Sequence, residues 1–266
     1  HRARNSGMTI ACGVDHLIES EARYNFSSEC DGDHGKVVYS INARRGKVIN
    51  IIKFITYHSS RHAATSELAT RAERTLNRVK QEGFASLVAG QKAFMDDFWE
   101  RSDIYIKGHS SAVGRHKHET QQAMRWNLFQ ILQASARAEG TGIPSKGLTG
   151  QTYEGHYFWD TEIYVMPILI YTAPEIARNL LRFRYSMLEQ ARARAREMNL
   201  QGALFPWRTI NGEEASAYYA GGTAQYHINA DIMFALKKYV DAVVTFFGQS
   251  EIHGIPCIQV ANGVPR

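Results

Sequence analysis

One stretch of sequence decides how this chain is interpreted: Gly147-Leu-Thr-Gly-Gln-Thr-Tyr-Glu-Gly-His-Tyr-Phe-Trp-Asp-Thr-Glu162, which leads into the apolar run Ile163 to Ile170. It combines aromatic rings, a histidine and carboxylates with glycines. Sugar rings stack on aromatic faces and carboxylates bind sugar hydroxyls, so this mixture is typical of a carbohydrate pocket. The alternative is a loop that enters a buried helix, with Trp159 in the core and Asp160 as a helix cap.

The composition of the whole chain is that of an ordinary globular protein. The chain has 266 residues, of which 44% are apolar and 21% charged, enough for a substantial core. The longest apolar run, Tyr164 to Tyr171, is interrupted by Pro167 and is too short to cross a bilayer. His1 to Gly7 is basic but lacks an apolar block, so it does not resemble a secretory signal. The sequence therefore predicts a cytoplasmic protein that does not bind a membrane.

The cysteines and histidines do not indicate a metal site. Cys12, Cys30 and Cys257 are odd in number and far apart, which argues against both a disulfide framework and a zinc site. His58 and His62 have helical i, i+4 spacing, but no third ligand lies near them in the sequence. We predict no bound metal.

The net charge of +5 raises the question of nucleic-acid binding. Much of the positive charge falls within one helical pattern without interleaved aromatic residues. A solvated helix face explains this pattern better than binding to phosphate backbones, so no nucleic-acid partner is predicted. The arginines concerned are Arg178, Arg182, Arg184, Arg192, Arg194 and Arg196.

The first part of the chain has the texture of β-structure. Val37 to Ile41 and Lys47 to Tyr57 are β-branched runs joined by a polar loop that ends in Gly46, which predicts a hairpin. An isolated hairpin is marginal in water, so these strands are expected to belong to a larger sheet. Upstream, only the turn Asp31 to Gly35 is indicated.

Helical patterns follow the strands. Thr65 to Glu67 opens a helix that breaks at Gly83, and a second helix runs from Phe84 towards Trp99. We therefore predict three segments: residues 1–60 as the remnant of an N-terminal β-domain, 61–117 as a helical linker, and 118–266 as the first part of a helical domain.

The helical domain alternates helices with polar, aromatic loops. In the first helix, Glu119 to Gln133, the apolar positions follow the stripe of a helix packed on one side. The Gly-rich loop Gly140 to Gly147 fits neither nucleotide-binding template and is interpreted as a substrate loop. A helical toroid with its loops at one end would gather Trp159, Asp160, Trp207, Arg208, Glu213 and His227.

Three motifs in this order resemble glycoside hydrolase family 65: Gly155 to Glu162, Phe205 to Glu214 and Gly222 to Asp231. The relevant members of that family are inverting disaccharide phosphorylases, which split α-linked glucosides with phosphate. The second and third motifs are most similar to kojibiose, nigerose and trehalose phosphorylases. One departure is Tyr219 to Gly222, where that subgroup would have a proline.

The resemblance implies a mainly α fold: a partial (α/α)6 barrel, preceded by linker helices and by the last strands of an N-terminal β-sandwich. It implies that Trp159 and Asp160 bind a glucosyl unit, which agrees with the stacking face of an indole and the acceptors of a carboxylate. The other expected substrate-binding residues are His156, Glu162, Arg208, Glu213 and His227. For Arg208, Glu213, Glu214 and His227, a purely structural role in the loops is the alternative.

The resemblance also implies the chemistry. An inverting transfer needs a carboxylic acid to protonate the leaving oxygen while a nucleophile attacks the opposite face of the sugar. Inorganic phosphate is the expected co-substrate and no cofactor is expected. Asp160 and Glu162 cannot form a catalytic pair within a helix, because a two-residue offset turns their side chains about 200° apart.

No catalytic residue is assigned within this chain. The general acid of the family is a glutamate of a later motif, expected beyond the end of the chain, and Val243 to Pro256 departs from a helical pattern as a truncated or frame-shifted product would. We therefore predict a glycosyltransferase parent that forms glucose 1-phosphate and is compatible with a homodimer, and an inactive fragment. The alternatives are a hydrolase of the trehalase type and a non-catalytic carbohydrate-binding or structural fragment.

Overall fold

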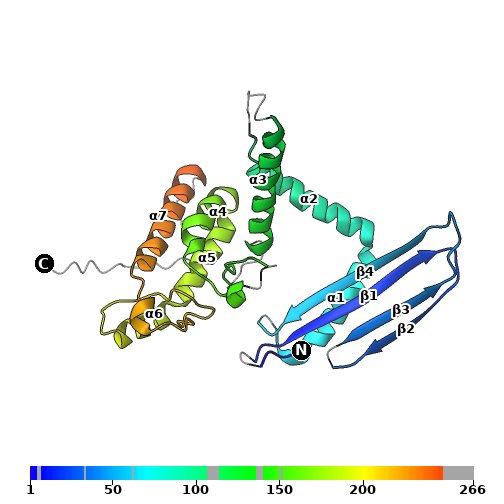
Figure 1. Ribbon diagram of the computed structural model, residues 1–266, viewed down its shortest axis with the longest axis horizontal. Helices are drawn as coiled ribbons and strands as arrows, with labels where there is room; N and C mark the ends of the chain where they lie inside the picture. The colour runs from blue at the N-terminus through cyan, green and yellow to red at the C-terminus, as the bar shows by residue number, and fades with distance from the viewer. Residues whose placement is uncertain are drawn as a thin grey trace. The chain divides into compact units, whose positions relative to one another are not determined.

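The computed structural model divides into two units, a β unit of His1–Asp97 and a helical unit of Phe98–Arg266 (Figure 1). Helix α2, Phe84–Ser102, runs across the junction. His62, Cys257 and most of the segment 243–256 lie outside the described part of the chain. The structure describes residues 1–4, 7–32, 34–61, 63–106, 114–135, 140–148, 150 and 152–247.

The described part of the β unit forms two antiparallel strand pairs. β1, Ile10–Ser20, pairs with β4, Ile49–Ser59, in a register that places Asp15 opposite Phe54. β2, Tyr24–Cys30, pairs with β3, Gly35–Ile41. The two pairs form separate two-stranded sheets.

The hairpin predicted between Val37–Ile41 and Lys47–Tyr57 is wrong, although both runs are strands. β3 folds back onto β2 through the predicted turn, where the Asp31 amide donates to the His34 carbonyl at 3.0 Å. β4 is left to pair with β1, about 40 residues earlier. The short connection wins because it closes a smaller loop, and the polar, fully exposed β2 gave no clear strand pattern in the sequence.

Helix α1, Leu68–Glu82, covers the β1–β4 pair after the short 3₁₀ turn η1, Thr65–Glu67. Leu68 and Ala72 are buried on this face, together with Phe54 of β4. Gly13 of β1 permits the close approach, because a Cβ atom there would lie 2.9 Å from both the Leu76 Cδ1 and Thr56 Oγ1 atoms. α1 ends at Gly83, whose φ of 83° confirms the predicted break.

In the described residues of the helical unit, five α-helices follow α2, with short turns between them. The first four helices are α3, Gly114–Ser135; α4, Met166–Thr172; α5, Pro174–Ser186; and α6, Leu188–Glu197. The last is α7, His227–Phe247. The turns are η2, Thr152–Gly155; the π-helical turn η3, Thr161–Val165, which runs into α4; and η4, Ala220–Thr223.

Two apolar clusters hold this unit together. The first lies among α4, α5 and α7, which pack side by side (Figure 1), and is centred on Met166, Ile170 and Leu180. The second lies beneath the loops, where Tyr157, Phe205 and Ile228 pack with α5 and α6. The loops are therefore part of the core at their base.

Two helix predictions need correction. The arginine-rich helical pattern from Arg178 to Arg196 does not form one helix, because the backbone turns at the buried Met187 (φ −93°, ψ 3°) and separates α5 from α6. The expected departure from helical pattern after Asp241 is wrong for the backbone up to Phe247, where α7 ends.

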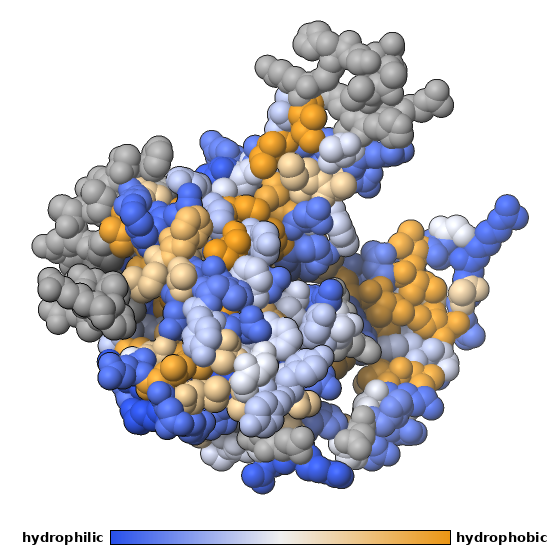
Figure 2. Space-filling view, turned by 60° about the vertical axis from the view of Figure 1, so that its left-hand side comes forward, coloured by the Kyte–Doolittle hydropathy of each residue, from blue (hydrophilic) through white to orange (hydrophobic). Residues whose placement is uncertain are grey.

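Large apolar side chains remain at the surface in both units, as the orange patches in Figure 2 illustrate. Phe26 and Val48 of the β unit are 66% and 70% exposed, and Trp126 of α3 is 59% exposed. Within the described ranges, no helix is both long and apolar enough to cross a membrane.

Candidate functional site

The three motif loops meet at their bases. Tyr157 of the first loop and Thr209 of the second form an antiparallel bridge, with N···O distances of 2.7 and 3.2 Å. Asn229 of α7 ties the second loop down, since its amide oxygen accepts from the Phe205 amide and its nitrogen donates to the Ala203 carbonyl. The sequence prediction that these loops gather is confirmed at these contacts.

A buried ion pair lies under the first loop. The Arg184 Nε atom donates to Glu162 Oε1 at 2.7 Å, and its Nη2 atom donates to Oε2 at 3.2 Å. The Tyr157 hydroxyl donates to the same Oε1 atom at 2.8 Å, and its ring centroid lies 4.4 Å from the Arg184 guanidinium carbon. We call Tyr157, Glu162 and Arg184 the buried triad, because each is at most 2% exposed.

The surroundings of the buried triad keep Tyr157 and Arg184 in their ordinary protonation states. Burial raises the pKa of the Tyr157 hydroxyl well above its ordinary value, and the Glu162 carboxylate raises it further. Burial alone would lower the pKa of Arg184, but Glu162 and Tyr157 outweigh it and the pKa is raised. Tyr157 therefore remains a hydrogen-bond donor and Arg184 a cation near neutral pH.

Trp159 and Asp160 lie between Tyr157 and Glu162 of the triad and are less buried than either. Trp159 is half-buried and Asp160 is exposed, with no side-chain hydrogen bond to cap the helical turn that follows. The ring of His227 meets the Trp159 indole edge-on, with centroids 4.9 Å apart. His227 is oriented in turn by Asp231, whose Oδ2 lies 2.7 Å from its Nδ1. An aromatic face, a carboxylate and an imidazole thus lie together.

The first two loops also form a second polar group. The Arg208 Nη2 atom donates to Glu154 Oε2 at 2.9 Å and lies 3.2 Å from His156 Nδ1. The structure therefore brings the predicted His156 and Arg208 together. Glu213 is exposed at the turn of the second loop, where its carboxylate accepts from Asn211.

Glu162 occupies a position unlike that of the other predicted residues. It is 1% exposed, and both its oxygens accept from the buried triad. In the structure it supports the loop from beneath, so its role as a substrate ligand stays a prediction.

The solvated-face interpretation of the arginine-rich helices is wrong for Arg184 and Arg194. Arg184 is buried in the triad, and Arg194 donates to Thr223 and lies 3.7 Å from Glu214. A signal for Arg184 was present, because it lies four residues after Leu180 on the apolar stripe of α5. No comparable signal in the sequence identified Arg194.

Glu214 is a further residue whose role only the structure reveals. Its carboxylate accepts from the backbone amides of Trp207, Arg208 and Ser216 at 2.8 to 3.3 Å. This supports the structural alternative for Glu214: the carboxylate holds the shape of the second loop. Trp207 then packs edge-on against Phe158.

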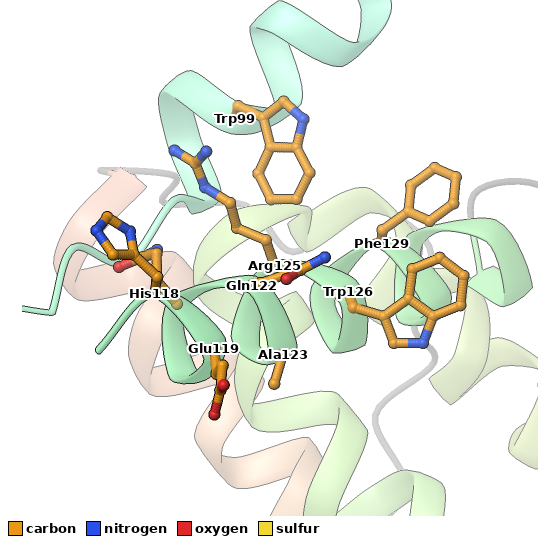
Figure 3. A pocket seen from close by; sticks show the side chains of 9 residues that line it. Trp99, His118, Glu119, Gln122, Ala123, Arg125, Trp126 and Phe129 are labelled. Carbon is orange, nitrogen blue, oxygen red and sulfur yellow. The ribbon is translucent and has the colours of Figure 1, made fainter. Parts of the chain in front are cut away.

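A separate hollow of about 790 Å³ lies along α3 (Figure 3). Trp99, Trp126 and Phe129 supply its aromatic rings. Gln121 binds the backbone of residues 104 and 106, and Arg125 pairs with Asp103 and lies over the Trp99 ring. None of the predicted substrate-binding residues lines this hollow.

The fold defines a class: a helical domain with aromatic and acidic side chains in its loops, preceded by antiparallel strands. Within that class, residues 1–98 match the N-terminal domain of glycosyl hydrolase family 65, and residues 125–245 match the family's central catalytic domain. The chain belongs to glycosyl hydrolase family 65. The predicted fold class, mainly α with a partial helical barrel after N-terminal strands, is confirmed.

Individual relatives agree with this assignment. The chain is 42% identical over 241 residues to an alpha,alpha-trehalose phosphorylase of Thermoanaerobacter brockii, a match that covers 91% of this chain and 30% of that protein. It is 32% identical over 224 residues to a kojibiose phosphorylase of Caldanaerobacter subterraneus subsp. tengcongensis, covering 79% and 28%. The chain thus spans less than a third of these relatives.

A solved structure is also similar. The one described as "Putative kojibiose phosphorylase from human microbiome" superposes with a TM-score of 0.76 at 28% identity, covering 90% of this chain and 31% of that one.

Within the described residues, no group of three or more His, Cys, Asp or Glu side chains is placed to hold a metal ion.

Proposed function

We propose that this chain carries the glucose-binding part of an inverting disaccharide phosphorylase that acts on an α-glucobiose such as trehalose or kojibiose. The observation that carries the proposal is that the half-buried Trp159, beside His227, and the exposed Asp160 lie on a segment held by a buried ion pair. Family membership and the similarity to a trehalose and a kojibiose phosphorylase support it.

The proposed binding follows from the chemistry of these side chains. The Trp159 indole supplies a face for one side of a glucose ring, and the Asp160 carboxylate can accept from two neighbouring hydroxyls. His227, fixed by Asp231, adds a polar group at the edge of the indole. His156, Arg208 and Glu213 are proposed to contact the neighbouring sugar.

The proposed reaction needs a proton donor and phosphate. A carboxylic acid protonates the glycosidic oxygen, phosphate attacks the anomeric carbon from the opposite face, and glucose 1-phosphate leaves with free glucose. Glu162 and Glu214 are not available as this acid, since their oxygens accept from Arg184, Tyr157 and backbone amides. The proposal therefore places the general acid outside these loops, and it includes no cofactor or metal.

The wider assignment is part of the same proposal. It keeps residues 1–60 as part of a β-sandwich, 61–117 as a linker and 118–266 as part of the barrel. The parent protein is proposed to be a cytoplasmic homodimer that takes a disaccharide and phosphate and binds neither nucleic acid nor membrane.

The test is calorimetric titration of the 266-residue chain with glucose. We expect saturable binding that Asp160→Asn and Trp159→Ala each weaken by about tenfold or more, because each removes a direct contact. Asp241→Asn is the matched control, since Asp241 is an exposed carboxylate of α7 that pairs with Lys237. Absence of glucose binding, or binding that survives both substitutions, would overturn the proposal.

A second assay addresses the reaction. The chain is incubated with phosphate and either trehalose or kojibiose, and glucose 1-phosphate is measured. We expect none from this chain alone, because the proposed general acid lies elsewhere. Glucose 1-phosphate formation would contradict that division of roles, and phosphate-independent glucose release would favour a hydrolase.

A further inference from the structure

We propose that Arg184 is a positioning residue for the Trp159–Asp160 pair, acting through Glu162 and Tyr157. The inference rests on the proposed function, since it concerns how that function's glucose-binding pair is held. Its starting observation is that one buried guanidinium contacts both ends of the short segment that carries the pair: it lies over the Tyr157 ring and donates two hydrogen bonds to Glu162.

The segment Tyr157–Glu162 is an arch with both ends fixed. At its start, the Tyr157 hydroxyl donates to Glu162 Oε1, and the Tyr157 backbone is bridged to Thr209. At its end, the Glu162 carboxylate is bound by two nitrogens of Arg184. Trp159 and Asp160 lie between these ends, so the fixed ends help to set the course of the backbone that carries them, and the Trp159 ring also contacts His227 and Tyr164.

The backbone of the arch is itself closed by hydrogen bonds. The amides of Glu162 and Ile163 donate to the Trp159 carbonyl at 3.0 and 3.4 Å. These bonds begin the π-helical turn Thr161–Val165, a wide turn that is uncommon and often found at functional sites. A displacement of the Glu162 backbone would therefore disturb the hydrogen bond to the Trp159 carbonyl.

Arginine is suited to this role in a way that lysine is not. The planar guanidinium binds both carboxylate oxygens at once and stacks on the Tyr157 ring, so it fixes orientation as well as distance. It comes from α5, whose neighbours Leu180 and Phe183 are in the apolar clusters, so the anchor is rigid. A lysine would keep the positive charge but could not bind both carboxylate oxygens with two nitrogens in a fixed plane.

Stability alone is a weak reason for this arrangement. Buried ion pairs can often be replaced by apolar residues of similar volume without loss of stability. The triad instead joins the two residues that flank the proposed glucose contacts. A positional role predicts that an apolar replacement keeps the fold but loosens the arch.

The experiment uses two variants of the whole chain, Arg184→Lys and the double variant Glu162→Leu with Arg184→Met. Thermal unfolding establishes that each is folded. Hydrogen exchange is measured on peptides covering residues 157–166, and glucose affinity is measured by calorimetry. Arg192→Met is the control, because Arg192 pairs with Glu189 on the exposed face of α6.

We expect faster exchange at Glu162 and Ile163 in both variants, and a glucose Kd raised about tenfold, because two side chains must then be ordered on binding. The control should change neither measurement. A folded double variant with unchanged exchange and unchanged affinity would overturn the role of Arg184. If the unsubstituted chain does not bind glucose, the proposed function fails, whereas the exchange measurement still supports or overturns the anchoring of the arch.

Discussion

The β unit and the helical unit differ in how each is packed internally. In the β unit, β2 is exposed along its whole length, and the core is confined to the layer between α1 and the β1–β4 pair. In the helical unit, two apolar clusters enclose residues such as Ala177 and Ile228, and even an arginine is buried. The helical unit therefore has a core of its own, and its loops are anchored in that core.

This difference matters for function. The residues proposed to bind glucose are carried by loops that are themselves part of the second cluster, through Tyr157 and Phe205. Binding geometry and packing are therefore coupled in the helical unit. In the β unit, most strand side chains remain at the surface, so substitutions there are expected to have smaller effects.

The largest expected effect on stability concerns the buried ion pair between Arg184 and Glu162 in the helical unit. Arg184→Met leaves the Glu162 carboxylate buried without its cation, so the free energy of unfolding of the helical unit should fall by about 3–5 kcal/mol. Urea unfolding followed by helical circular dichroism measures it. The double variant with Glu162→Leu should regain much of the loss. A single variant as stable as the double one would show that the charge is solvated.

A second pair of substitutions compares the two units directly. Leu180→Ala, in the first cluster, should cost about 2–5 kcal/mol, because it creates a cavity among α4, α5 and α7. Phe26→Ala, on the exposed β2, should change stability by less than about 0.5 kcal/mol. Urea unfolding measures both. Equal losses of unfolding free energy in the two variants would show that the two units do not differ in this way.

A third prediction tests whether the β unit is tightly packed where α1 covers it. Gly13→Ala should destabilise by about 1–3 kcal/mol, because its Cβ atom would meet the Leu76 and Thr56 side chains at 2.9 Å. Gly35→Ala is the matched control, since nothing lies within 4 Å of a Cβ atom there. Thermal unfolding of the two variants gives the comparison. If Gly13→Ala left the stability unchanged, α1 would be packed loosely against the β1–β4 pair.

The smallest expected effect concerns pH. The hydrogen bond from Lys80 lowers the pKa of Asp15 below its ordinary value, and partial burial opposes it. Because the folded-state pKa is depressed, the pair stabilises the β unit above the pKa of the unfolded chain. The contribution is lost as the pH falls below about 4, towards the folded-state pKa.

Asp15→Asn should remove this acid dependence and cost less than about 1 kcal/mol at neutral pH, since solvent screens the pair. Thermal unfolding between neutral and acidic pH measures it. A variant with the same acid loss as the unsubstituted chain would exclude Asp15 as its source.

Much of the fold was predictable because its signals are local. The break at Gly83, the helix α3 and the turn between β2 and β3 follow from residues within a few positions of one another. The pairing of β4 was not predictable in the same way. A hairpin partner lies close in sequence, whereas β1 lies about 40 residues away, and β2 carried no alternating pattern.

The candidate site divides in the same manner. The sequence alone shows which loops carry aromatic and acidic residues, and it predicts Trp159, Asp160 and His227 as substrate-binding residues, because these types suit sugar binding and lie in three motifs that resemble one family. Only the tertiary structure decided that Glu162 turns inward to Arg184 while Asp160 faces outward. The physical reason is that burying a charged carboxylate is costly unless it is paired with a cation. The cation that pairs with Glu162 lies 22 residues further along the chain, on another helix.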